Sequence, residues 1–206
     1  MVILATAFGY IEAAVVVYLR QIFHPEGFTF PLAVFGISET ARKMLLVEIG
    51  REAATIVVII SGCILAGHNR RQRLAFFLII FAVWDIFYYV FLKIILGWPA
   101  SITDWDILFL IPVAWAGPVL APVLASGVML VLAGMILHRD AAGKAIKVTA
   151  WDLSGLTICC VAIIATFCMA GRYMQSADYA SHFSWVIFGA GLAGAAAISA
   201  RCVYRS

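Results

Sequence analysis

The sequence predicts an all-α integral membrane protein, with residues 1–206 forming a single transmembrane domain: a bundle of six transmembrane helices with short loops. The composition carries this prediction, because 65% of the residues are hydrophobic and only 12% are charged, whereas about a quarter of a soluble domain is charged. The same composition argues against a disordered protein and against a nucleic-acid-binding one. We therefore expect the lipid bilayer, and no nucleic acid, to be a partner of the chain.

Six segments are long enough to cross a bilayer, which takes about 20 mainly apolar residues in a helix. They are residues 1–23, 43–67, 74–96, 107–137, 152–173 and 184–204. The first segment lacks a basic start and a cleavage site, so we interpret it as a retained span rather than a signal peptide. The apolar segment 28–38 is too short to cross, and we expect it to lie in the interface or to re-enter.

The fourth segment is too long for one straight span and contains Pro112, Pro118 and Pro122. Proline removes a backbone hydrogen-bond donor and clashes with the preceding turn of a helix. The sequence therefore predicts a fourth helix that is broken or kinked at these prolines. The sixth segment contains the small-residue run GAGLAGAAAISA, which favours close packing, either inside the chain or against another subunit.

The distribution of basic residues predicts the orientation, since Lys and Arg are enriched in cytoplasmic loops. The 68–73 and 138–150 loops each carry three basic residues, whereas the 97–106 and 174–183 loops carry none. This pattern predicts that both basic loops and both termini face the cytoplasm, in a plasma membrane of the bacterial inner-membrane type. Arg42 and Lys43 would then lie on the outer side, and they count against the assignment.

Ionisable side chains interrupt the first three spans, although a charge at the bilayer centre costs about 2.5–3.5 kcal/mol. Helix spacing places Glu48, Arg51 and Glu52 of the second span on one side. It also aligns Asp85 of the third span with Tyr88 or Tyr89. We expect these stripes and the acid of the first span to face one another as a polar seam that is open to the outer side. Trp115 lies beside the predicted break and is suited either to a pocket wall or to a membrane anchor. The candidate binding residues are Glu12, Glu48, Arg51, Glu52, Asp85, Tyr88, Tyr89, Lys93 and Trp115.

The seam favours binding or transport of a small ligand, an ion or a proton, because acids on separate helices are hard to explain by packing alone. Three alternatives stay open. The polar groups could serve only as contacts between helices. The chain could be a non-catalytic subunit that assembles with other membrane subunits or with copies of itself. A membrane-embedded enzyme could use Glu12, Glu52 or Asp85 as acid and base groups.

No cofactor is predicted from the sequence. A b-type haem needs facing histidines inside the bilayer, whereas the four histidines lie in loops or at the ends of spans: His24, His68, His138 and His182. A metal site at the outer face stays an open alternative, because the spacing of its candidate ligands is not diagnostic. These ligands would be His24, Glu26, Asp104, Asp106, Asp178 and His182.

Overall fold

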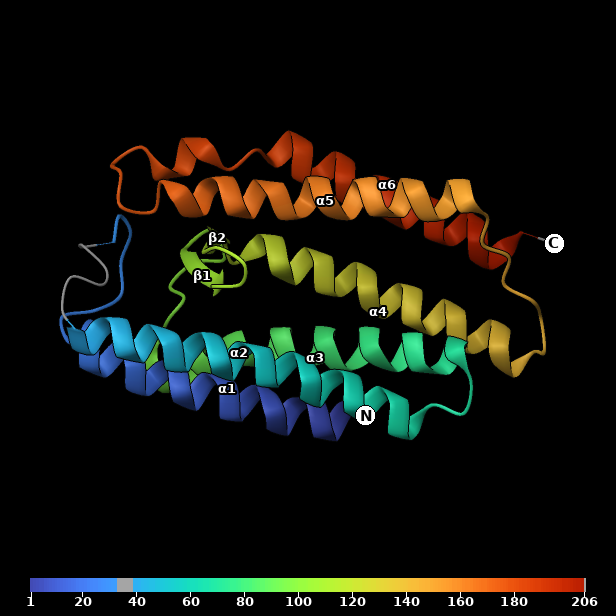
Figure 1. The fold of residues 1–206 in the computed structure, drawn as a ribbon, viewed down its shortest axis with the longest axis horizontal. Helices are drawn as coiled ribbons and strands as arrows, with labels where there is room; N and C mark the ends of the chain where they lie inside the picture. The colour runs from blue at the N-terminus through green and yellow to red at the C-terminus, as the bar shows by residue number, and fades with distance from the viewer. Residues whose placement is uncertain (33–38, 206) are drawn as a thin grey trace.

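The computed structural model describes residues 1–32 and 39–205, and its six long helices run back and forth along one axis (Figure 1). The helices are α1 (Val2–Phe23), α2 (Glu39–Ala66), α3 (Arg70–Leu96), α4 (Leu120–Ala141), α5 (Ala150–Arg172) and α6 (Trp185–Tyr204). All six are long and apolar enough to cross a membrane, in agreement with the predicted polytopic membrane protein. The other described elements are β1 (Trp105–Phe109), β2 (Trp115–Pro118) and the 3-10 helix η1 (Tyr179–His182).

Local sequence signals explain where two of the helices begin or end. The Asn69 side chain accepts a hydrogen bond of 2.9 Å from the backbone N–H of Gln72 at the start of α3, as N-cap residues do. Gly97 ends the same helix with a φ of 69°, a left-handed conformation that favours glycine. At the start of α5, Thr149 and Asp152 form a reciprocal capping box.

Helix α3 lies at the centre of the bundle and packs against α1, α2 and α4. Helices α5 and α6 form a second layer, and α4 lies between that layer and the group of α1, α2 and α3 (Figure 1). The small residues of α6 allow a close approach to α5, because a Cβ on Gly191 would lie 2.9 Å from Ile163 Cγ1 and 3.2 Å from the Cys159 carbonyl oxygen. The close packing predicted for the sixth span therefore occurs within the chain.

The fourth span differs from its prediction, because α4 begins only at Leu120 and the predicted kinked helix over 107–137 is not what the structure shows. The strands β1 and β2 instead form an antiparallel hairpin, in which Asp106 pairs with Gly117. The expectation of an all-α chain is wrong for this segment.

The three prolines explain why a hairpin replaces the start of the predicted helix. Pro112 lies between the two strands and Pro118 is the last residue of β2, so neither has to donate a hydrogen bond within a helix. Pro122 lies in the first turn of α4, where a backbone N–H would have no partner inside the helix.

The hairpin folds back into the bundle between the two helix layers, next to the N-terminal end of α4 (Figure 1). Phe109 of β1 packs against rings of α3, and Trp115 of β2 stacks on Phe167 of α5 with ring centroids 6.3 Å apart. Gly171 of α5 permits this approach, since a Cβ there would lie 1.9 Å from the Ala114 carbonyl oxygen. Non-helical backbone at membrane depth is tolerated where it is buried in protein or lines a water-filled cavity. The two layers cover the strands, whereas Ile111, Pro112 and Val113 of the turn are exposed.

The alternating directions of the helices place both ends of the described chain at the same end of the bundle, together with the loops that follow α2 and α4 (Figure 1). At the opposite end, the backbone N–H of Leu32 donates to the Met174 carbonyl oxygen (2.8 Å) and so ties the segment after α1 to the loop after α5. The expectation for residues 28–38 falls mainly on residues 33–38. These lie outside the described residues, and the expectation stays a prediction.

Candidate functional site

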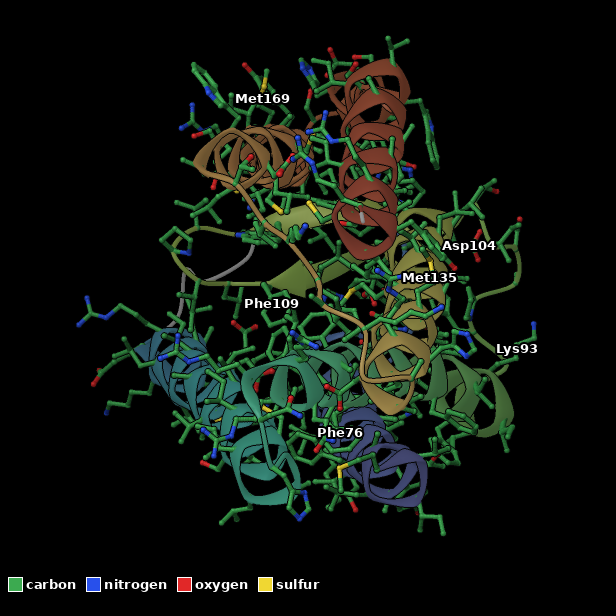
Figure 2. The ribbon with its side chains drawn as sticks, turned by 90° about the vertical axis from the view of Figure 1, so that its right-hand side faces the viewer. Phe76, Lys93, Asp104, Phe109, Met135 and Met169 are labelled. Carbon is green, nitrogen blue, oxygen red and sulfur yellow. The ribbon has the colours of Figure 1, made fainter. Side chains whose placement is uncertain are left out.

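A cavity of about 200 Å³ lies among α1, α3, α4, α5 and the hairpin. Five of the nine candidate binding residues line it: Glu12, Asp85, Tyr88, Tyr89 and Trp115. The hairpin contributes Ile107, Leu108 and Phe109 to the wall. Figure 2 shows Phe109 in the interior of the bundle. The cavity therefore lies beneath the hairpin. Glu12 of α1 and Asp85 of α3 bring a carboxyl group to it from two of the spans that carry acids in the sequence.

Asp85 of α3 is the carboxylate of the cavity that has no cationic partner. Its Oδ2 accepts a hydrogen bond of 2.8 Å from Ser126 Oγ of α4, and no Lys or Arg among the described residues forms an ion pair with it. Ser126 is 1% exposed and also lines the cavity. The sequence analysis did not select Ser126, and its only signal there is a single hydroxyl in an apolar run.

Three hydrogen-bond donors in the wall of the cavity are buried without a partner among the described residues. They are the indole Nε1 atoms of Trp84 and Trp115 and the hydroxyl of Tyr89. Trp84 and Tyr89 are 6% and 5% exposed, so they are withdrawn from bulk solvent. Buried donors in proteins normally have a partner, so three unpartnered donors on residues that line one cavity are unusual. Trp84 was not among the predicted binding residues.

Glu12 has a cationic partner on another helix. The Arg51 guanidinium of α2 forms ion pairs with Glu12 of α1 and with Glu48, which lies three residues earlier on α2. Its Nε donates to Glu48 Oε2 at 3.0 Å, so the pair with Glu48 is the two-pronged kind that guanidinium favours. One guanidinium therefore serves two carboxylates and joins α1 to α2.

Glu52 lies one residue after Arg51 but has a different role in the structure. Its Oε2 accepts a hydrogen bond of 2.8 Å from the backbone N–H of Leu110, which directly follows β1. Glu52 is 6% exposed and is not among the residues that line the cavity. It thus satisfies a backbone donor beside the turn of the hairpin, a donor that would have no partner in lipid.

Arg20 and Asp106 form a second buried ion pair that the sequence analysis did not predict. Arg20 Nη2 lies 2.9 Å from Asp106 Oδ1, and the Tyr88 hydroxyl donates to Asp106 Oδ2 at 3.1 Å. The guanidinium carbon lies 3.7 Å from the ring centre of Trp98 and 4.1 Å from that of Phe28. Asp106 was considered from the sequence only as a possible metal ligand of the outer face, whereas the return of the hairpin buries it beside Arg20.

Lys93 lies apart from the cavity, in the last turn of α3. Its ammonium donates to the carbonyl oxygens of Gly97 and Pro99 at 3.1 and 2.7 Å, so it satisfies carbonyl groups just beyond the end of the helix. Figure 2 shows Lys93 and Asp104 at the edge of the bundle. The long side chain thus reaches past the end of the helix rather than into the bundle.

The candidate metal ligands of the outer face are dispersed over separate contacts. Asp106 binds Arg20, Asp104 accepts from the backbone N–H groups of Ala100 and Ser101, and Asp178 lies 3.3 Å from His182. Within residues 1–32 and 39–205, the structure has no group of three or more His, Cys, Asp or Glu residues that could hold a metal ion.

Comparisons with protein families, with curated proteins and with solved structures gave no significant match to this chain.

Proposed function

We propose that this chain is a small polytopic membrane protein that binds a small ligand in the cavity beneath the hairpin. The observation that carries the proposal is the wall of the cavity, where an acid without a cationic partner lies among aromatic rings and unpartnered donors. A polar group at membrane depth is costly unless it is paired, and unpartnered donors are costly too. A ligand that offers both a positive group and an acceptor removes both costs.

We further propose that the ligand reaches the cavity from the outer side of a plasma membrane, with both termini in the cytoplasm. The basic loops support this orientation. On the cytoplasmic side of the cavity, α3, α4 and α6 are packed together by a cluster of buried apolar residues: Ala75, Leu78, Ala133, Ile136 and Val203. Passage through the chain requires this cluster to separate, so binding is the function that the geometry supports best and transport is its extension.

The alternative of a non-catalytic subunit in a larger membrane assembly receives less support. One basis for it was the small-residue run of the sixth span, and Gly191 and Gly194 of that run already approach α5 of the same chain. A polar seam used only for contacts between helices accounts for Arg51 and Arg20, since each is paired. It does not account for a cavity that keeps Asp85 and three free donors together.

Thiol labelling in intact cells tests the proposal. A cysteine is placed at Ala125, which lines the cavity from α4, or at Val131, which is 65% exposed on the same helix and faces lipid in the proposed arrangement; the five native cysteines are replaced by alanine. We expect small charged methanethiosulfonate reagents, added outside, to modify Ala125→Cys and not Val131→Cys, because the reaction needs a hydrated thiolate. Failure of both a cationic and an anionic reagent to reach Ala125→Cys would contradict an outward-facing site.

A further inference from the structure

We infer that the cavity takes a small organic cation, an ammonium group that carries one hydrogen-bond acceptor. This inference rests on the proposed ligand-binding function and adds the chemical class of the ligand. Three independent features of the described residues support it: the charge balance around the cavity, the aromatic wall and the free donors.

The charge balance favours a cation. Among the described residues between α1, α2, α3 and the hairpin, five carboxylates lie with two guanidinium groups, those of Arg20 and Arg51. The carboxylates belong to Glu12, Glu48, Glu52, Asp85 and Asp106. If all five were ionised, three negative charges would remain unbalanced in a region of low dielectric. A bound cation offsets part of this excess, whereas an anion would increase it.

Asp85 is the carboxylate that a ligand cation can reach. Glu12 shares Arg51 with Glu48, and Asp106 holds Arg20. Among the described residues, Asp85 accepts a hydrogen bond only from the Ser126 hydroxyl, which leaves its other oxygen available to a cation. Both oxygens of an ionised carboxylate accept contacts. None of the described residues that line the cavity is Lys or Arg, so no side chain of the wall competes for this position.

The aromatic wall favours an organic cation over a metal ion. Rings crowd the cavity on several sides and contact one another, from Phe81 and Trp84 through Phe109 to Trp115 and Phe167. Aromatic rings attract ammonium groups through their quadrupoles, and cages of this kind are used to recognise quaternary ammonium ligands. A hard metal ion instead requires several oxygen ligands, which an aromatic wall does not supply.

The free donors indicate what else the ligand carries. Trp84 Nε1, Trp115 Nε1 and the Tyr89 hydroxyl are buried without partners among the described residues. These atoms belong to residues that line the cavity, so a small rotation of the side chains lets an oxygen atom on the ligand accept from them, whereas a wholly apolar cation leaves them unsatisfied. The cavity of about 200 Å³ limits the size, because an apolar cavity of about 150 Å³ holds benzene. A short amino alcohol meets both requirements.

The test compares choline with 3,3-dimethylbutan-1-ol, which has the same shape and hydroxyl group but carbon in place of the charged nitrogen. Binding to the full chain in lipid nanodiscs is measured by titration calorimetry. We expect choline to bind about tenfold or more tightly than the neutral alcohol, since only the cation gains from the carboxylate and the ring faces. Asp85→Asn keeps the acceptor for Ser126 and removes the charge, so it should reduce the preference to about twofold or less.

Glu39→Gln is the matched control, because Glu39 pairs with Lys43 and both side chains are largely exposed. This variant should keep the full preference for choline. Equal binding of the two probes by the unaltered protein overturns the inference and leaves ligand binding intact. Failure of both probes to bind while Ala125→Cys is labelled from outside also overturns the ligand class. The comparison in the unaltered protein decides the matter even if Asp85→Asn does not fold.

Discussion

Replacing Gly171 by alanine tests whether the hairpin is anchored between the two helix layers as described. A Cβ at this position would lie 1.9 Å from the Ala114 carbonyl oxygen and 2.7 Å from its carbonyl carbon. Real Cβ atoms do not come closer than 3.0 Å to such atoms, so the backbone of the hairpin or of α5 has to move. Overpacking of this kind costs about 1–3 kcal/mol, whereas alanine in place of a helical glycine gains about 0.5–1 kcal/mol. We therefore expect a net loss of stability.

The assay is thermal unfolding of the purified protein, followed by circular dichroism. A loss of 1 kcal/mol lowers the midpoint by about 2–4 °C in a chain of this length. Gly134→Ala on α4 is the matched control, because a Cβ there meets nothing within 4 Å, and it should leave the midpoint unchanged or raise it. Trp115 directly follows Ala114 and lines the cavity, so Gly171→Ala should also weaken choline binding. A Gly171→Ala protein as stable as Gly134→Ala would refute the described position of the hairpin.

The remaining predictions concern the polar contacts and the orientation. Asp106→Asn leaves the Arg20 charge buried without its carboxylate, so stability should fall by about 3–5 kcal/mol, measured by the same unfolding assay. Glu52→Gln keeps an oxygen that accepts from the Leu110 N–H and should change stability little, whereas Glu52→Ala should cost about 1–3 kcal/mol. A cysteine at Asn69 should react with an impermeant thiol reagent only after the cells are permeabilised, because the basic loops face the cytoplasm.

The six helices could be predicted from the sequence because the bilayer imposes a length and an apolar composition on each span. The second and third helices start four residues before the predicted 43 and 74, at Glu39 and Arg70, since polar first turns lie outside the apolar run. The hairpin could not be predicted. Its strands are short and apolar, and such runs suit a helix or a strand equally. Their state is decided by contacts with α3 and α5, which are distant in sequence.

The site could be predicted only in part, for a related reason. Helix periodicity predicted which acids share a face, and Glu12 and Asp85 do line one cavity. It could not show that Arg51 reaches across to Glu12, because that contact depends on how α1 and α2 pack. The ion pair of Arg20 with Asp106 depends on the return of the hairpin. Contacts within one helix can thus be predicted from the sequence, whereas contacts between elements cannot.

An experimental structure of the chain with a bromine-bearing alkyl trimethylammonium salt would test the binding site most directly. The bromine atom scatters anomalously, so its position is independent of how the side chains are built. We predict a bromine peak inside the cavity, next to Trp84 and Trp115, with the ammonium group facing Asp85. A cavity closed by its own side chains would contradict the proposed function, and bromine peaks only on the lipid-facing surface would contradict the ligand class.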